Sequence, residues 1–416
     1  MTALQRRFDQ DLEAALAGDR PARLGLAVSG GGDSIAMLHL AADWAARAGV
    51  GLAVASVDHR LRAAAADEAA GVIRAAAALN LMGDVLAWTG WDGRGNLMAA
   101  ARAARYRLLA DWAAARGISH IALGHTADDQ AETVLIEIAR RAGPRGQSGM
   151  AARRQSGGVV WLRPMLGIAR DDLRDWLRAR GTPWVDDPSN DDPRFARIRA
   201  RQVLAGQPGA TQALTDLAAQ ARDRLRALDA AAGAAAGMIA LERGEMRLPL
   251  TDFAALDPAV ARHLIGAALI WLAGPGPAPG GRALDHLMDR IARAEGGPLH
   301  GVMTTLRRGD LILTRDATCQ PGPVAVLPGQ ALIWDRLWRV TPPVAGQIAP
   351  LGAAGLSHLH DPRATGLSHA ALRASPALWH GGRPIAAAFP LRGNPPLLPA
   401  EWLGDRDDFV RTSFAH

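Results

Sequence analysis

The sequence predicts an α/β fold: a parallel sheet with helices on both faces, followed by a helical domain and a small mixed α+β domain. Three observations support this prediction. Over the first 200 residues, short apolar runs alternate with amphipathic, helix-like runs, a pattern typical of buried parallel strands joined by crossover helices. After about Gly206 the chain is rich in alanine at helical spacing, and beyond Pro298 short strand-like segments appear.

The strands of the first part are expected at 24–28, 51–57, 85–88, 120–123 and 159–162. The helices between and after them are expected at 35–46, 67–79, 97–116, 127–140 and 170–180. Sheets of this kind bind ligands at the carboxyl ends of their strands. Because Ser29, Asp58 and Gly124 each follow an expected strand, these residues are predicted to share one rim.

The second half is predicted to contain helices and then strands. Helices are expected at 211–238, 259–272 and 283–294, strands at 311–314 and 337–340, and a Pro/Gly-rich linker at 320–329. The chain is therefore predicted to divide into an α/β domain over 1–205, a mainly helical domain over 206–318, and a small C-terminal domain with strands over 319–416.

Composition excludes several classes of protein. The 416 residues contain no apolar run long enough to span a membrane, and residues 1–19 are charged and amphipathic, unlike a signal peptide. The single cysteine, Cys319, excludes a disulfide framework, a CxxC redox pair and a cysteine-ligated cluster, and fits a cytoplasmic protein. All 47 basic residues are arginine, so no lysine can serve as a base or a phosphate ligand.

The most informative segment is SGGGDS, which joins an expected strand to an expected helix. Its glycines let the backbone turn tightly and direct several N–H groups at one anion, and the helix start adds its positive dipole end. The segment lacks both the Walker pattern and the third glycine of a dinucleotide-binding loop. It predicts a phosphate-binding loop, with a glycine-rich turn capped by Ser and Asp as the alternative. The loop residues are Ser29, Gly30, Gly31, Gly32, Asp33 and Ser34.

A pair of arginines lies on the helix expected at 97–116. Asn96 can cap this helix, and Arg102 and Arg105 share a face with Tyr106. Two arginines without carboxylate neighbours suit an anionic ligand. The alternative is a solvated basic face.

Carboxylates cluster after the strand expected at 120–123, in the segment GHTADDQAET. Asp128, Asp129 and Glu132 lie within about one helical turn of each other. Such a cluster at a strand end can hold a metal ion or an ammonium group. The alternative is that the acidic residues complement the helix dipole, with Thr126 as the N-cap.

Two basic clusters flank these segments. An acidic turn at 186–190 leads into the first cluster, which consists of Arg194, Arg197, Arg199 and Arg201. This series is typical of contacts to nucleic-acid phosphates, although it can also pair internally with Asp186, Asp187, Asp191 and Asp192. The second cluster consists of Arg140, Arg141, Arg145, Arg153 and Arg154. Two basic clusters beside one nucleotide site favour RNA or DNA as a partner.

Together these motifs resemble the tRNA(Ile)-lysidine synthase family, a group of N-type ATP pyrophosphatases in the PP-loop superfamily. The resemblance covers residues 24–201 and is carried by SGGGDS, VDHRLR, N-x4-ARAARY, GHTADDQAET, RPML and DDPSNDDPRFARIR. The chain departs from the family pattern at Thr126, at Arg141-Ala142-Gly143 and at Ile198, where the family has histidine, Gly-Ser-Gly and asparagine.

The resemblance implies a ligase that uses ATP and Mg²⁺ to join free L-lysine to C2 of the wobble cytidine in tRNA(Ile) with a CAU anticodon. An adenylated cytidine forms first and pyrophosphate leaves. The lysine amine then displaces AMP, which gives lysidine and changes codon reading from AUG to AUA. The family resemblance further implies a cytoplasmic enzyme without a membrane partner. Its oligomeric state is left open, with a homodimer as one alternative.

The resemblance also implies roles for individual residues. The catalytic residues are Asp33, Arg102, Arg105, His125 and Asp129. The loop from Ser29 to Ser34 binds ATP, Asp33 holds the metal ion, and Asp129 and Glu132 bind the lysine ammonium. The residues that contact RNA are Arg140, Arg194, Arg197, Arg199 and Arg201. The resemblance further implies that the domain over 1–205 is catalytic and that the helical domain over 206–318 contacts tRNA.

Two other interpretations stay open. A different PP-loop tRNA-modifying enzyme, such as a 2-thiocytidine synthetase, needs paired cysteines, whereas this chain has one. A non-catalytic, nucleotide-responsive RNA-binding protein would release no pyrophosphate when mixed with ATP, lysine and tRNA.

Overall fold

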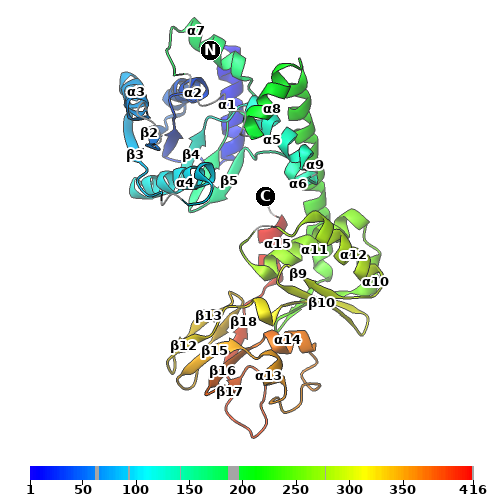
Figure 1. Ribbon diagram of the computed structural model, residues 1–416. Helices are drawn as coiled ribbons and strands as arrows, with labels where there is room; N and C mark the ends of the chain where they lie inside the picture. Colours follow the sequence, from blue (N-terminus) through cyan, green and yellow to red (C-terminus); the bar gives the residue numbers. More distant parts are fainter. Residues whose placement is uncertain (61–64, 92–93, 141, 186–195, 277, 415–416) are drawn as a thin grey trace. The chain divides into compact units, whose positions relative to one another are not determined.

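The computed structural model describes the chain except for residues 61–64, 92–93, 141, 186–195, 277 and 415–416 (Figure 1). Its contacts form two compact units, Met1–Asp223 and Arg224–His416. The three-domain division with boundaries after 205 and 318 stays a prediction.

The first unit is built on a six-stranded sheet with the order β3-β2-β1-β4-β6-β5. The strands are β1 (Arg23–Ala27), β2 (Gly51–Asp58), β3 (Met82–Ala87), β4 (His120–Leu123), β5 (Arg153–Ser156) and β6 (Val159–Leu162). All neighbours pair in parallel except the edge strand β5, which the sequence did not predict. The connections reverse direction between β1 and β4, which is the switch point where such sheets bind ligands. The predicted fold class is therefore confirmed.

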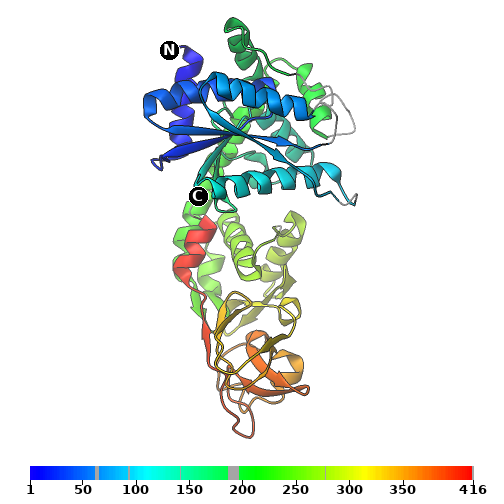
Figure 2. The same cartoon turned by 90° about the vertical axis from the view of Figure 1, so that its left-hand side faces the viewer.

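Helices cover both faces of this sheet, with blue helices on one side and the cyan helix α4 on the other (Figure 2). The helices on the first face are α1 (Ala3–Leu16), α2 (Gly32–Ala48), α3 (Ala65–Ala78) and α7 (Arg170–Ala179). They share a core with Leu24 and Leu26 of β1. Helix α4 (Leu97–Ala115) shares a separate core with Ala27. The alternation of Leu26 and Ala27 between the two cores is the period of two that a strand imposes on its side chains.

The rest of the first unit is helical. These elements are α5 (Ala127–Ala139), α6 (Pro144–Gln147), α8 (Ala196–Ala205) and the start of α9 (Ala210–Ala235). Gln130 of α5 holds the turn after α6, because its amide donates to the carbonyl of Met150 and accepts from the Met150 N–H. The turn that contains Gly149 and Met150 therefore packs against the acidic segment GHTADDQAET, to which Gln130 belongs.

The second unit contains three antiparallel sheets and two hydrophobic cores. The larger core takes residues from Ala232 to Phe414, and the smaller one takes residues from Leu351 to Leu391. Its helices include α10 (Leu250–Ala254), α11 (Pro258–Ala273), α12 (Gly281–Ala292), α13 (Gly352–Leu356), α14 (His369–Ala374) and α15 (Arg406–Phe414). The five-stranded sheet contains β7 (Ala240–Glu242), β8 (Glu245–Pro249), β9 (Gly297–Leu299), β10 (Val302–Arg307) and β11 (Asp310–Arg315).

The other two sheets lie further along the chain. Their strands are β12 (Val324–Val326), β13 (Leu332–Trp334), β14 (Trp338–Val340), β15 (Gly346–Pro350), β16 (Pro376–His380), β17 (Arg383–Ala387) and β18 (Ala400–Trp402). The predicted linker at 320–329 is wrong, because β12 lies inside it and pairs with β15. Among the helices of the described residues, none is long and apolar enough to cross a membrane.

Candidate active site

The glycine loop runs from the end of β1 into α2. Its Ser34 hydroxyl donates to the carbonyl of Gly31 (2.9 Å) and accepts from the N–H of Ser29 (3.1 Å). Gly30 has a φ of 92°, which lies in the left-handed region that glycine tolerates best. Within the described chain, the N–H groups from Gly30 to Asp33 donate no hydrogen bond to protein. These free donors at a helix start form the anion-binding arrangement that the sequence predicts.

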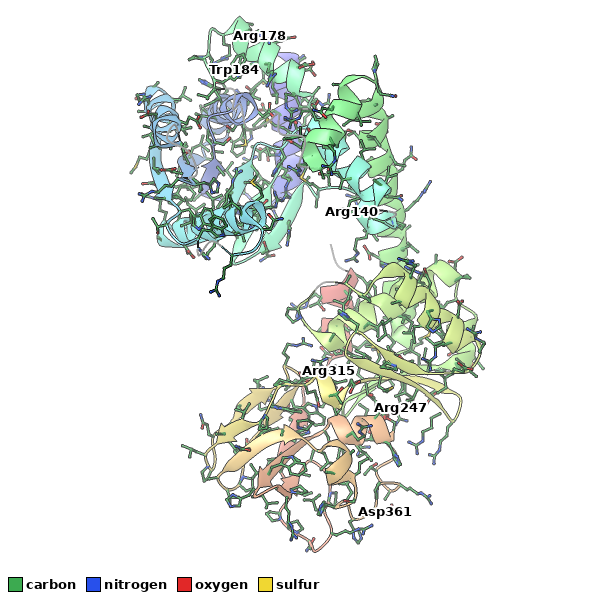
Figure 3. All side chains as sticks on the ribbon, viewed as in Figure 1. Arg140, Arg178, Trp184, Arg247, Arg315 and Asp361 are labelled. Carbon is green, nitrogen blue, oxygen red and sulfur yellow. The ribbon has the colours of Figure 1, made fainter. Side chains whose placement is uncertain are left out.

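Two neighbours hold the loop in place. A Cβ on Gly124, just after β4, would lie 3.1 Å from the Cα of Ser34, so glycine lets the start of α2 approach this strand end. On another side, the Val185 N–H donates to the Gly30 carbonyl (3.1 Å). Trp184 lies beside it, close enough that a Cβ on Gly32 would be 3.2 Å from its ring (Figure 3). Two of the three strand ends predicted to share a rim, those followed by Ser29 and by Gly124, therefore lie side by side.

Asp33 lies in the first turn of α2 and has one paired and one unpaired oxygen. Its Oδ2 accepts from Nε of Arg170 at 3.0 Å, whereas its Oδ1 is buried and has no hydrogen-bond partner. Burial raises the pKa of Asp33 above its ordinary value, although Arg170 opposes this shift. A buried, unpaired carboxylate oxygen beside a phosphate loop fits a Mg²⁺ ligand, because this ion is held by one or two carboxylates together with substrate phosphates. No group of three metal-ligating side chains occurs among the residues described.

Asp129 begins α5 and is fully occupied by protein contacts. Its Oδ2 accepts from the N–H (2.9 Å) and hydroxyl (3.2 Å) of Thr126, which completes a capping box and confirms Thr126 as the N-cap. Its Oδ1 lies 3.4 Å from Nη2 of Arg170. Burial acts to raise the pKa of Asp129, but Arg170 and His125 hold it below its ordinary value. The carboxylate is therefore ionised and already paired on both oxygens.

Glu132 lies one turn further along α5, with a side chain that is only 1% exposed. Its Oε1 accepts from Nε of Arg201 (2.9 Å), and its Oε2 is buried without a partner. Burial raises the pKa of Glu132 against the opposing effect of Arg201. Of the two carboxylates predicted to bind an ammonium group, Glu132 is the one that keeps an unpaired oxygen.

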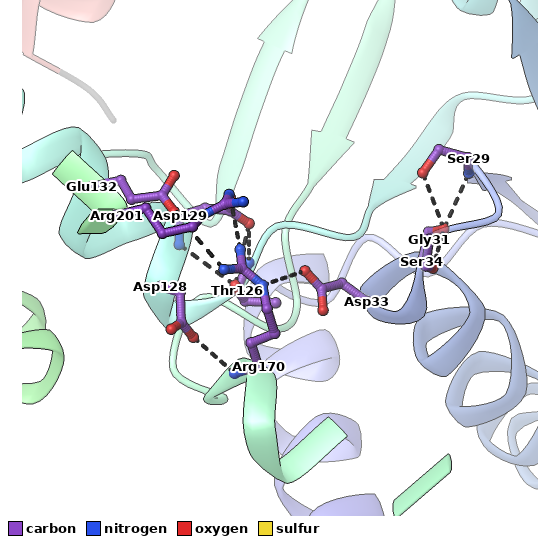
Figure 4. A network of polar contacts seen from close by, with 10 residues as sticks. All are labelled: Ser29, Gly31, Asp33, Ser34, Thr126, Asp128, Asp129, Glu132, Arg170 and Arg201. Atoms are coloured by element: carbon purple, nitrogen blue, oxygen red, sulfur yellow. Dashed lines mark hydrogen bonds and ion pairs between the residues drawn. The ribbon is translucent and has the colours of Figure 1, made fainter. Parts of the chain in front are cut away.

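Arg170 lies at the centre of these carboxylates (Figure 4). Besides Asp33 and Asp129, its guanidinium reaches Oε1 of Glu132 at 3.8 Å. Its backbone N–H donates to Oδ2 of Asp128 at 2.8 Å, so Asp128 caps the start of α7. Burial acts to lower the pKa of Arg170, but Asp33 and Asp129 raise it above its ordinary value.

The arginines predicted on α4 lie in a cationic region of the same rim. Asn96 caps α4, as predicted, by accepting from the N–H groups of Met98 and Ala99. The Arg102 guanidinium lies over the Tyr106 ring, 5.3 Å from its centroid. Arg105 is half-buried, and no hydrogen bond or ion pair to its side chain is found among the described residues. Burial lowers the pKa of Arg105, the expected result for a guanidinium without a counterion.

His125 is half-buried, and the charges that act on it are Asp129 and a group of arginines that includes Arg105. Burial, reinforced by Arg163, Arg105 and Arg197, lowers its pKa to about 3, although Asp129 opposes the shift. Its Nδ1 is buried and has no hydrogen-bond partner. The imidazole is therefore neutral near pH 7, and a neutral ring suits the positioning of a phosphate better than the donation of a proton.

We expect the His125 ring to stay unprotonated from pH 8 down to pH 5. The measurement is an NMR pH titration of the imidazole nitrogens, with His125→Gln used for assignment. A midpoint near the ordinary value of 6.5 would contradict the buried environment. At His125, the unfolded chain binds more protons than the folded chain between pH 6.5 and about 3. This histidine therefore makes the free energy of unfolding fall as the pH falls through that window, by at most about 1.4 kcal/mol per pH unit.

The arginines predicted to bind RNA have different surroundings. Arg201 pairs with Glu132, and Arg197 donates to the Thr133 hydroxyl at 3.5 Å. Arg199 on α8 is exposed. Arg140 is exposed on the C-cap of α5 and pairs with Glu137 at 3.0 Å (Figure 3). Arg194 and the acidic turn at 186–192 lie outside the described residues.

The sequence interpretation missed Arg163 and Arg170 as site residues. Arg163 is 5% exposed, donates to the carbonyl of Ala151 (2.7 Å) and acts electrostatically on Tyr106 and His125. Both arginines follow β6, whose carboxyl end lies on the same rim as those of β1 and β4. The rule that flagged Ser29, Asp58 and Gly124 would have flagged the segment after β6 as well.

The comparisons with known proteins agree with this geometry. A family model described as a PP-loop domain matches residues 2–207. A tRNA(Ile)-lysidine synthase from Ruegeria pomeroyi is 41% identical over 411 residues, which cover 97% of this chain and 97% of that protein. Another, from Methylobacterium nodulans, is 39% identical over 331 residues, covering 76% of this chain and 96% of that protein.

Among solved structures, a U34-tRNA thiolase from Methanococcus maripaludis is 14% identical to this chain, with a TM-score of 0.44. The match covers 52% of this chain and 77% of that one. The matched PP-loop domain covers the residues that form the rim, and the Ruegeria relative matches nearly the whole chain. The chain therefore belongs to the tRNA(Ile)-lysidine synthase family of PP-loop enzymes.

Proposed function

We propose that this enzyme joins free L-lysine to C2 of the wobble cytidine of a CAU-anticodon tRNA(Ile), using ATP, through an adenylated cytidine. The observation that carries the proposal is a pair of buried, unpaired carboxylate oxygens, Asp33 Oδ1 and Glu132 Oε2. One lies in the first turn after the phosphate loop and the other in the acidic segment of the neighbouring strand connection. They supply one ligand for a cation on the phosphates and one for a substrate amine.

The phosphate-binding part of the site is the glycine loop. Its free N–H groups from Gly30 to Asp33 and the positive end of α2 bind the phosphates that leave as pyrophosphate. Asp33 Oδ1 would hold Mg²⁺. When bound, this ion offsets negative charge as the phosphates separate. Ser29 and Ser34 are predicted to bind ATP as part of this loop, and the hydrogen bonds of the Ser34 hydroxyl support the proposal because they hold the loop in shape.

The nucleobase-binding part of the site is the cationic region of α4. Arg105 lacks a protein counterion among the described residues and is half-buried, so it is available to the α-phosphate or to the adenylated base. Arg102 stacks on Tyr106, at the exposed side of the same helix face. The wobble base must leave the anticodon stack to reach this region, and neutral His125 then positions the phosphate that links base and AMP.

The amine-binding part of the site is the acidic segment of α5. The lysine ammonium donates to Glu132 Oε2, and ionised Asp129 adds a negative charge beside it. The ammonium gives one proton to Glu132 Oε2, an unpaired oxygen on a carboxyl whose pKa is raised by burial. The free amine then attacks C2, the bond from C2 to the adenylate oxygen breaks, and AMP departs with the electron pair. Excluding water from this buried corner protects the adenylated base from hydrolysis.

The proposal is tested by nucleoside mass analysis of tRNA(Ile) after incubation with the protein, ATP and isotope-labelled lysine. The expected result is one modified cytidine that carries the lysine label, together with AMP and pyrophosphate. Pyrophosphate release without labelled nucleoside would point to a different PP-loop modification. Binding of tRNA without pyrophosphate release would point to a non-catalytic RNA-binding protein.

The two arginines at the end of the basic series are expected to respond differently to substitution. Arg199→Gln should weaken tRNA binding and reduce the slope of log affinity against log salt by roughly 0.7 to 0.9, since one exposed charge no longer contacts a phosphate. Arg201→Gln should preserve the slope and lower turnover, because this guanidinium orients Glu132. Filter binding at several salt concentrations measures the slope. Equal slopes for wild type and Arg199→Gln would place the anticodon arm elsewhere.

A further inference from the structure

Arg170 contacts the phosphate-binding part and the amine-binding part of the proposed site and belongs to neither. Its Nε lies 3.0 Å from Asp33 Oδ2, on the phosphate side, and its Nη1 lies 3.8 Å from Glu132 Oε1, on the amine side. Between them, Nη2 reaches Asp129 at 3.4 Å. A single planar guanidinium thus has contacts to side chains that come from the segments after β1 and β4.

The arrangement of paired and unpaired oxygens is what makes these contacts informative. In both Asp33 and Glu132, the oxygen that faces Arg170 is paired, and the opposite oxygen is buried and unpaired. Arg170 therefore holds the rotation of the Asp33 carboxylate by a hydrogen bond. Together with Arg201, whose Nε donates to Glu132 Oε1 at 2.9 Å, it also holds the rotation of Glu132, so that each unpaired oxygen is directed away from Arg170. Among the described residues, Arg201 contacts Glu132 and not Asp33, so Arg170 is the guanidinium that links the two carboxylates.

Arg170 is itself fixed by the backbone. Its N–H donates to Asp128 Oδ2 (2.8 Å), and the Ala127 N–H donates to the carbonyl of Ile168 (2.9 Å). These bonds join the start of α5 to the start of α7, and the Arg170 side chain is only 14% exposed. A side chain with so little freedom can hold two partners in a constant relation.

We propose that Arg170 is the positioning residue that fixes the metal-facing carboxylate of Asp33 and the amine-facing carboxylate of Glu132 relative to each other. This inference rests on the proposed function. Arg170 forms no bond with a substrate. By orienting the carboxylates of Asp33 and Glu132, it keeps the activated base and the attacking amine at a fixed distance and angle. This geometry depends on the forked shape of the guanidinium as well as on its charge.

The test compares Arg170→Gln and Arg170→Lys with wild type in two assays. One is tRNA-dependent ATP–pyrophosphate exchange without lysine, which reports adenylation, and the other is lysidine formation against lysine concentration. Arg170→Gln should slow exchange and raise the KM for lysine, each by roughly 10- to 100-fold. Arg170→Lys should restore the melting temperature and leave the KM for lysine raised, since an ammonium group lacks the fork.

A matched control is Arg47→Gln, which removes an exposed ion pair with Asp9 (2.5 Å) at the far end of α2, and which should leave both assays unchanged. A purely structural role predicts less folded enzyme with a normal KM for lysine, and that result in either Arg170 variant would overturn the inference. If Arg170→Gln does not fold, Arg170→Lys alone decides. Failure of wild type to form lysidine would instead reject the proposed function.

Asp128 provides an independent test, because it acts on the Arg170 backbone. Asp128→Ala removes the acceptor of the Arg170 N–H and should raise the KM for lysine, whereas Asp128→Asn keeps an oxygen acceptor and should stay near wild type. Equal KM values for the two Asp128 variants would mean that this cap does not position Arg170.

Discussion

Asp33→Asn is expected to abolish turnover, with a loss of about a thousandfold, because metal stabilisation of separating phosphates contributes several kcal/mol and each 1.4 kcal/mol is about tenfold in rate. The substitution keeps the shape of the side chain and removes the negative charge from the buried Oδ1. An amide oxygen is a weaker ligand for Mg²⁺, and the neighbouring amide group places donors where an acceptor is needed. The measurement is ATP–pyrophosphate exchange in the presence of tRNA.

The fold should survive this substitution, for a reason that the electrostatics provide. The pKa of Asp33 is raised by burial, so the folded state disfavours the charged carboxylate relative to the unfolded state, and a neutral amide does not carry that cost. Arg170 keeps Asp129 and Glu132 as partners. The melting temperature should therefore change little.

Asp43→Asn is the matched control for Asp33→Asn, since Asp43 lies on the same helix in an exposed pair with Arg180 at 3.6 Å. It should leave exchange unchanged. Near-normal exchange in Asp33→Asn, with normal circular dichroism, would remove Asp33 from the metal site.

The phosphate loop was predictable because its signal is local. A strand, three glycines and a helix start determine where the N–H groups point, whatever the rest of the chain does, and the observed φ of Gly30 and the free donors follow from that. The strand ends after β1, β2 and β4 were placed on one rim for a similar reason, since parallel strands end on the same side of a sheet.

The position of Arg170 was not predictable in the same way. In the sequence it is one of several arginines in an amphipathic helix, and neither spacing nor composition separates it from Arg178, which forms an exposed pair with Asp175. Its partners are Asp33 and Glu132, which lie 137 and 38 positions earlier in the chain. They meet only because the strand order β1-β4-β6 places three connections side by side. Information of that kind lies in the topology.

The pairing of the arginines after the acidic turn shows the same limit. The sequence offered RNA phosphates or Asp186, Asp187, Asp191 and Asp192 as partners. Those four carboxylates lie outside the described residues, whereas Arg201 pairs with Glu132 on α5. A carboxylate that is distant in sequence was not among the alternatives, because nothing local links α5 with α8.

The second large effect is expected at Glu132. Glu132→Gln should raise the KM for lysine by roughly 10- to 100-fold, since a charge-assisted hydrogen bond contributes about 1.5 to 3 kcal/mol. Adenylation should be nearly unaffected, because the contacts of Glu132 are to Arg201 and Arg170 and not to the glycine loop. The amide is close to the protonated carboxyl that burial favours, so the variant should fold.

Asp129 is the informative comparison, because sequence reasoning treated both carboxylates as ligands of the ammonium group. Asp129→Ala is also expected to weaken the lysine step more than adenylation. This variant additionally removes the capping box with Thr126, which costs about 1 kcal/mol of stability. Its defect should therefore appear in the melting temperature as well as in the KM for lysine, whereas that of Glu132→Gln should appear in the KM alone.

The assay is lysidine formation over a range of lysine concentrations, alongside ATP–pyrophosphate exchange, for wild type and both variants. A raised KM in Glu132→Gln with normal exchange and a normal melting temperature would assign the amine to the unpaired Oε2. A normal KM in Glu132→Gln, together with a raised KM in Asp129→Ala, would reverse the assignment. Asp129 would then have to release Arg170 or Thr126 to bind lysine, and the capping box would be a contact of the ligand-free enzyme only.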